Sequence, residues 1–146
     1  MTTRTVHTLA ELDTFAQEML STLSQKDSAH VIALTGDLGV GKTSFTQALA
    51  KHLDIAEHVV SPTFMIMRSY QTENPNFKKL VHIDAYRVED IREMEVLKIP
   101  ELFSEAGTVI CIEWPERIAA LIPQDAHCIS FAVNSDDSRT ITYGNS

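Results

Sequence analysis

Apolar residues recur along the first third of the chain with spacings that distinguish helices from strands. Over residues 9–23 they fall on one helical face, and Thr8 with Glu11 forms a T-x-x-E capping box at its start. Residues 31–34 form a continuous apolar run, which is typical of a buried strand. A second amphipathic helix is predicted over residues 42–53.

The remaining elements are shorter and alternate less regularly. The pattern predicts helices over residues 89–97 and from about Pro115, and strands over residues 65–70, 80–83, 109–112, 128–133 and 140–143. Turn-forming residues separate the first two of these strands, which favours a hairpin, and also the last two. The alternation of strands and helices predicts one α/β domain over residues 1–146, with a largely parallel sheet flanked by helices and an antiparallel hairpin.

Composition and charge narrow the function classes. The chain has 146 residues, 44% hydrophobic and 22% charged, with a formal net charge of −8. A stand-alone nucleic-acid binder needs a basic surface, so this acidic chain is expected to meet nucleic acid only through partners. Cys111 and Cys128 lie in apolar stretches and are expected to be reduced thiols. With no apolar run of membrane-spanning length and no signal sequence, a cytoplasmic protein without membrane contact is predicted.

One segment carries a nucleotide-binding motif. Residues 36–43 read GDLGVGKT and match G-x-x-x-x-G-K-[ST], the P-loop or Walker A motif, between a predicted strand and a predicted helix. Glycines let the backbone wrap an anion, and its N–H groups together with the helix N-terminus attract phosphate oxygens. Lys42 would neutralise the outer phosphates and the Thr43 hydroxyl would ligate Mg²⁺. We therefore expect ATP or ADP to contact Asp37, Leu38, Gly39, Val40, Gly41, Lys42, Thr43 and Ser44.

A P-loop site also needs a carboxylate that holds Mg²⁺ together with the hydroxyl of the loop, and two residues are candidates for it. Asp84 and Glu113 each follow an apolar strand, and the carboxyl ends of parallel strands meet at one edge of the sheet. The pattern alone does not rank them. Hydroxyl residues at 61–63 could reach the metal or the γ-phosphate as a switch loop does. Trp114, the only tryptophan, directly follows Glu113 and either packs near the nucleotide or serves as a core anchor.

Several strings taken together resemble one family. GDLGVGKTSF, SPTF at residues 61–64, HIDAYR at residues 82–87 and IEWPERI at residues 112–118 occur in this order in the bacterial TsaE (YjeE) family. The resemblance spans about residues 8–143. It implies a small ATPase needed for tRNA threonylcarbamoyladenosine biosynthesis, which acts on a complex of TsaD and TsaB and meets tRNA only through that complex.

The same resemblance implies particular residue roles. It makes Thr43 and Glu113 the Mg²⁺ ligands, which resolves the choice that the pattern left open. Asp84 becomes the second acidic residue of the site, and Thr63 falls in the switch-like loop. Residues near the first helix and the last strands contact the adenine in the family, and Thr8 and Arg139 are the matching candidates. Lys42, Asp84 and Glu113 are then the catalytic residues.

Other functions remain open on the sequence. In the leading hypothesis water attacks the γ-phosphate, with Asp84 or else Glu116 orienting it and Arg87 as a candidate arginine finger. A small-molecule P-loop kinase is the alternative, although the arginines are scattered and form no lid. A nucleotide sensor without useful turnover is the third possibility.

Overall fold

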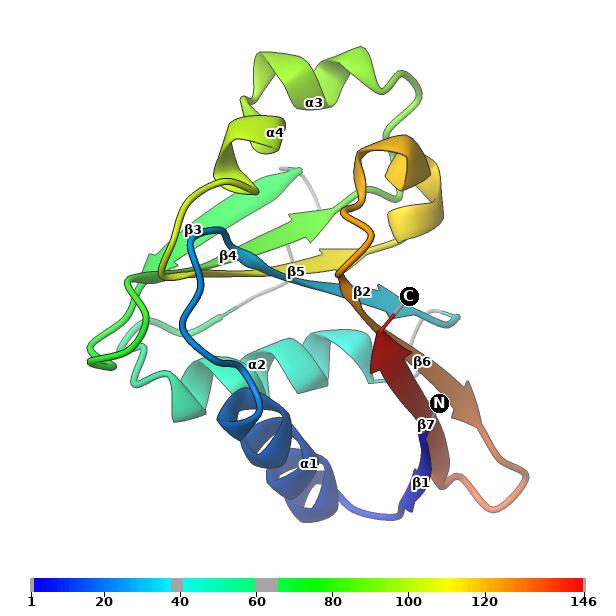
Figure 1. Cartoon of the computed structure of the whole chain (residues 1–146). Coiled ribbons are helices and arrows are strands. Elements are labelled where there is room, and N and C mark those ends of the chain that lie inside the picture. The colour runs from blue at the N-terminus through cyan, green and yellow to red at the C-terminus, as the bar shows by residue number, and fades with distance from the viewer. Residues whose placement is uncertain (1, 38–40, 60–65, 146) are drawn as a thin grey trace.

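The computed structural model describes residues 2–37, 41–59 and 66–145, and Figure 1 shows their arrangement. Within these residues a seven-stranded sheet has the order β1-β7-β6-β2-β5-β4-β3. The elements in chain order are β1 (Thr2–Val6), α1 (Leu9–Ser21), β2 (His30–Thr35), α2 (Lys42–His52), β3 (Met67–Gln71), β4 (Lys79–Asp84), α3 (Arg92–Val96), α4 (Ile99–Leu102), β5 (Thr108–Glu113), the 3₁₀ helix η1 (Pro115–Leu121), β6 (His127–Val133) and β7 (Arg139–Asn145).

The centre of the sheet is parallel and its edges are antiparallel. Strand β2 pairs in parallel with β5 and β6, and β5 pairs in parallel with β4. The hairpin of β3 with β4 and the pairings of β7 with β6 and β1 are antiparallel. This arrangement confirms the predicted α/β fold, including the hairpin. Because the four parallel strands all end at one edge, residues that follow them are brought together there.

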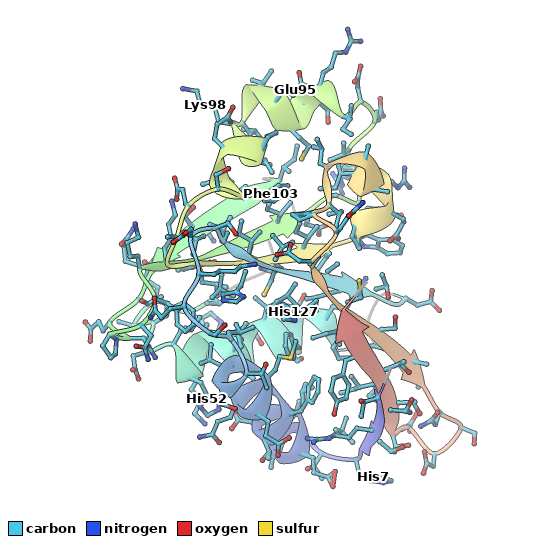
Figure 2. All side chains as sticks on the ribbon, in the orientation of Figure 1. His7, His52, Glu95, Lys98, Phe103 and His127 are labelled. Carbon is cyan, nitrogen blue, oxygen red and sulfur yellow. The ribbon has the colours of Figure 1, made fainter. Side chains whose placement is uncertain are left out.

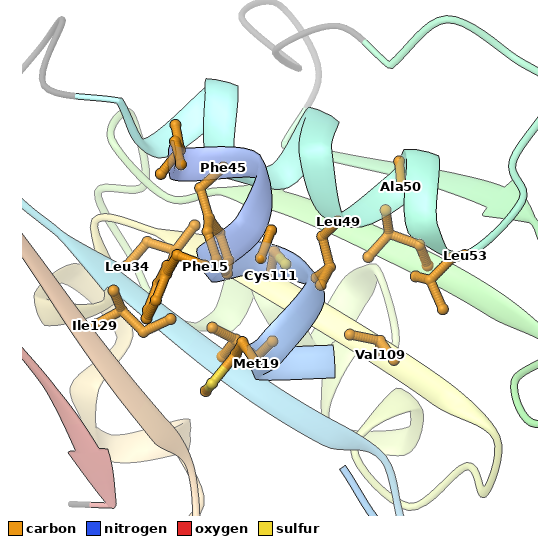
Figure 3. Packing of buried hydrophobic residues seen from close by; sticks show 14 of the residues in the cluster. Phe15, Met19, Leu34, Phe45, Leu49, Ala50, Leu53, Val109, Cys111 and Ile129 are labelled. Atoms are coloured by element: carbon orange, nitrogen blue, oxygen red, sulfur yellow. The ribbon is translucent and has the colours of Figure 1, made fainter. Parts of the chain in front are cut away.

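Helices cover both faces of the sheet. Helices α1 and α2 lie on one face, and α3, α4 and η1 lie on the other (Figure 1). Alternate residues of the central strands face the two layers, so that Val109 and Cys111 pack with α1 and α2 whereas Ile110 and Ile112 pack on the opposite side. Figure 3 shows Phe15, Leu49 and neighbouring side chains between the two long helices and the sheet. This packing fixes α2 against the sheet.

Two details of the fold differ from the sequence prediction. Strand β1 was not predicted, because only Val6 of its five residues is buried and an edge strand shows no apolar alternation. The helix predicted over residues 89–97 is shorter, since Asp90 accepts a hydrogen bond from the backbone N–H of Arg92 at 2.9 Å and Lys98 takes a left-handed conformation with φ 58°. The four-residue helix α4 follows that turn.

Two histidines begin neighbouring strands at the edge of the sheet opposite the P-loop. The ring centroids of His30, the first residue of β2, and His127, the first residue of β6, are 5.8 Å apart. Burial lowers the pKa of His127, and His30 and Lys26 add to the shift, while Asp125 opposes it. The unfolded chain then binds the proton more tightly than the folded one. Above pH 6.5, the ordinary pKa of histidine, His127 is neutral in both states and does not oppose folding. As the pH falls below that value the unfolded chain takes up the proton first, so the free energy of unfolding decreases.

We therefore expect His127→Gln to reduce the sensitivity of the fold to mild acid. Between about pH 7.5 and about pH 5.5 the fall in melting temperature should be smaller than in the wild type, by about 2 °C, because a half-buried imidazole retains part of its hydration. Thermal denaturation followed by circular dichroism measures it. The matched control is His58→Gln at an exposed position. Equal acid sensitivity of the wild type and His127→Gln would contradict this prediction.

Candidate functional site

The P-loop joins the carboxyl end of β2 to the start of α2. Gly36 and Asp37 follow the strand, and Gly41 is the N-cap of the helix with φ 115°. A β-carbon at Gly41 would lie 3.9 Å from Phe131 Cδ1, an ordinary contact, so it is the left-handed backbone that requires glycine here. Leu38, Gly39 and Val40, which the sequence predicted to contact nucleotide, lie outside the described residues.

Lys42 is the first residue of α2 and is buried, with 3% of its surface exposed. Its ammonium donates to the carbonyl oxygen of Gly36 at 2.7 Å and lies 4.1 Å from the centroid of the Trp114 ring. A carbonyl and an aromatic face compensate a buried cation only in part. The ammonium of Lys42 is therefore a buried cation at the start of α2 whose charge its described neighbours compensate only in part.

Trp114 combines an unusual backbone with a contact to the site. It follows β5 with φ 58° and ψ 50°, a left-handed conformation that is rare for a bulky residue. Its ring also packs on that of Tyr86, with centroids 5.0 Å apart. Backbone strain of this kind persists where surrounding structure enforces it, commonly at functional sites. The ring also packs against the apolar cluster on the α3 side of the sheet, so Trp114 has a core contact as well as its contact with Lys42, and both interpretations of the sequence have a contact behind them.

The side chains of Thr43, on α2, and Glu113, at the end of β5, are in direct contact. The Thr43 hydroxyl donates to Oε2 of Glu113 at 3.2 Å, and Glu113 is only 5% exposed. Asp84 is the cross-strand partner of Glu113, is half-buried, and accepts a hydrogen bond from the backbone N–H of Tyr86 at 3.0 Å. The two competing carboxylates are thus neighbours, and Glu113 is the one that contacts Thr43.

A third side chain on the same face of the sheet had no role in the sequence prediction. His82 Nε2 lies 2.6 Å from Oε2 of Glu113, and His82 is fully buried in the middle of β4. The signal in the sequence was the spacing of His82 and Asp84, which places both on one face of a strand. That spacing did not reveal the partner, because Glu113 lies on another strand.

Thr8 and Arg139 lie near the same edge of the sheet but have local partners. Thr8 caps α1 by accepting a hydrogen bond from the backbone N–H of Glu11 at 3.1 Å, which is one half of the predicted capping box. The Glu11 carboxylate accepts its bond from the backbone N–H of His7 at 2.6 Å, one residue before the expected donor. Arg139 begins β7, opposite Val6 of β1 and Val133 of β6, and its guanidinium donates to the carbonyl oxygen of Asp137. Arg139 therefore lies opposite the carboxyl end of β6, whereas Thr8 follows β1, two strands away from β6 in the sheet.

The remaining predicted site residues divide by position. Ser44 is half-buried in the first turn of α2, and Asp37 is exposed. Glu116 is exposed on η1, and Arg87 is exposed after β4. Thr63 and its loop lie outside the described residues. Across the part of the chain that is described, no group of three or more His, Cys, Asp or Glu side chains could hold a metal ion. Mg²⁺ typically takes one or two carboxylates and completes its shell with water, hydroxyl or phosphate oxygens.

A buried thiol lies below the carboxylate pair. Cys111 precedes Glu113 by two residues on β5, and burial raises the pKa of its thiol to about 12. The thiolate is the reactive form of cysteine, so Cys111 is inert at neutral pH and acts as a small apolar residue of the core.

A strand, a P-loop and a helix beside a parallel sheet define the P-loop class of nucleotide-binding folds. The family profile described as "Threonylcarbamoyl adenosine biosynthesis protein TsaE" matches residues 6–141, and the chain belongs to this TsaE family. None of the described helices has the length and apolar character to cross a membrane.

Individual relatives agree with this assignment. The tRNA threonylcarbamoyladenosine biosynthesis protein TsaE of Bacillus subtilis is 42% identical over 113 residues, which cover 77% of this chain and 68% of that protein. The protein of the same name from Borreliella burgdorferi is 38% identical over 95 residues, covering 65% and 66%. The crystal structure of Bacillus subtilis YdiB superposes with a TM-score of 0.77 at 27% identity, covering 99% of this chain and 84% of that one.

Proposed function

We propose that this chain is a Mg²⁺-dependent ATPase of tRNA threonylcarbamoyladenosine biosynthesis, which acts on the TsaD–TsaB complex through its cycle of ATP binding and hydrolysis. The contact of Thr43 with Glu113 beside the buried Lys42 is the observation that supports this most strongly. The names of the relatives support the pathway.

In this proposal the phosphates of ATP or ADP lie against residues 37–44 at the N-terminus of α2. The positive end of the helix and the Lys42 ammonium favour anion binding there. The hydroxyl oxygen of Thr43 and a carboxylate oxygen of Glu113 lie 3.2 Å apart, and oxygen atoms of these kinds are the ligands that Mg²⁺ prefers. When bound, Mg²⁺ would neutralise phosphate charge. Thr8 and Arg139 would flank the adenine, and Thr63 would approach the γ-phosphate.

Hydrolysis would proceed by in-line attack of water. The water oxygen forms a bond to the γ-phosphorus as the bond to the β,γ-bridging oxygen breaks, which yields ADP and phosphate. Lys42 would stabilise the charge that develops on the phosphoryl oxygens. Asp84 is our candidate for orienting the water, because it is the cross-strand neighbour of Glu113 and its backbone N–H is held by the carbonyl of Ile66 at 2.8 Å.

The charge of the chain supports a function through partners. With a net charge of −8, the protein would contact tRNA only through the TsaD–TsaB complex, in the cytoplasm. Helix α3, with Glu95 on it, lies on the opposite face of the sheet from α1 and His52 (Figure 2). Its acidic side chains are a candidate surface for a basic region of a partner.

The test is phosphate release from ATP with Mg²⁺, with and without purified TsaD–TsaB, for the wild type and Glu113→Gln. We expect the pair to raise turnover, and Glu113→Gln to lower it by about 10²–10³-fold, because the variant loses a charged oxygen ligand. Glu105→Gln, on a glutamate that pairs with Lys79 away from the site, is the matched control. If the pair leaves the rate unchanged and a metabolite panel is phosphorylated instead, the chain is a small-molecule kinase.

A further inference from the structure

We infer that His82 is a positioning residue for the metal site, holding the Glu113 carboxylate in the orientation that binds Mg²⁺. This inference rests on the proposed function, since it assigns His82 a role toward the cation that Thr43 and Glu113 would hold. His82 would touch neither nucleotide nor metal. It would act only through Glu113.

The hydrogen bonds of the site carry the inference. One oxygen of Glu113, Oε2, contacts both the Thr43 hydroxyl at 3.2 Å and His82 Nε2 at 2.6 Å. An ionised carboxylate only accepts hydrogen bonds, so Nε2 of His82 is the donor. If the Thr43 hydroxyl turns its lone pair to a metal, His82 remains as a donor to Glu113. Replacing a residue that orients a metal ligand in this way typically costs about 10–100-fold in metal affinity.

The burial of His82 makes its hydrogen bond to Glu113 important to both side chains. The side chain is fully buried between apolar neighbours of β4, where a polar ring costs free energy unless it is hydrogen-bonded. Nδ1 of His82 has no hydrogen-bond partner among the described residues. The bond to Glu113 is therefore the one interaction in the described structure that accounts for a histidine at this position.

The chain offers a matched comparison in His30. It is also a buried strand histidine whose Nδ1 has no partner among the described residues, but its Nε2 lies 2.5 Å from the backbone carbonyl oxygen of Ser24, at the far edge of the sheet. Replacing either histidine removes one buried ring and one hydrogen bond. Only the replacement of His82 removes a contact to Glu113.

The test measures ADP binding by titration calorimetry, once with Mg²⁺ and once with EDTA. For His82→Leu we expect affinity in Mg²⁺ to fall about 10–100-fold while affinity in EDTA stays within about twofold of the wild type, because only the metal-dependent part relies on Glu113. His82→Gln should restore most of the Mg²⁺ dependence, since its amide nitrogen reaches the position of Nε2. His30→Leu should leave both affinities unchanged.

The outcomes separate the two hypotheses. If the wild type binds ADP no better with Mg²⁺ than with EDTA, the metal site of the proposed function fails. If the wild type shows that dependence and His82→Leu keeps it, or loses affinity equally in both conditions, the positioning role is overturned. His82→Leu should also add nothing in a Glu113→Gln background. If His82→Leu does not fold, His82→Asn, whose shorter amide cannot reach Glu113, must lose the Mg²⁺ dependence that His82→Gln keeps.

Discussion

Lys42→Met should sharply reduce ATP hydrolysis while leaving the fold at least as stable as the wild type. The ammonium of Lys42 is the one buried cation of the described P-loop residues, and among the described residues it contacts the Gly36 carbonyl and the Trp114 ring. Loss of a preorganised positive group at a developing phosphoryl charge costs about 10²–10³-fold in turnover. Methionine fills a similar volume without a buried charge, so the melting temperature should stay constant or rise.

Phosphate release and thermal denaturation measure the two halves of this prediction. Lys79→Met is the control, because Lys79 is a half-buried lysine that pairs with Glu105 on the other side of the molecule from the P-loop. That variant should hydrolyse ATP at the wild-type rate. Hydrolysis by Lys42→Met within a fewfold of wild type, or a marked fall in its melting temperature, would show that the buried ammonium serves the fold instead.

The largest effect on stability is expected for Phe45→Ala. Phe45 is fully buried, its ring contacts those of Phe15 and Phe131 at centroid distances of 5.7 and 6.1 Å, and its backbone N–H donates to the Gly41 carbonyl at 2.8 Å (Figure 3). Removing a buried phenylalanine ring costs about 3–5 kcal/mol in the free energy of unfolding. For a chain of this size that corresponds to a fall of roughly 10 °C in melting temperature.

Phe45→Ala should weaken ADP binding as well, since the ring anchors the first turn of α2 against the sheet. Urea denaturation gives the free energy, and the same calorimetry gives the affinity. Phe45→Leu retains most of the apolar volume and should cost about 1.5 kcal/mol or less. Equal stability of the alanine and leucine variants would contradict the proposed anchoring by the ring.

Much of the fold could be predicted from local patterns. The helix at residues 9–23 and the apolar strand at residues 31–34 were predicted to within two residues of α1 and β2, because spacing and capping act within one element. The P-loop motif is equally local, since it is recognised from eight consecutive residues. Strand β1 was missed because its pairing with β7 joins the two ends of the chain, and no short pattern records that contact.

The sequence by itself determined that a lysine and a threonine begin a helix after a glycine-rich turn, and that two carboxylates end apolar strands. The pattern of residues determined neither which carboxylate meets Thr43 nor what holds that carboxylate. The position of α2 against the sheet brings Thr43 to Glu113, and the parallel register of β4 with β5 brings His82 within hydrogen-bonding distance of Glu113. Local backbone preferences act over a few residues, whereas these contacts link residues 31 and 70 positions apart and exist only when the strands pair.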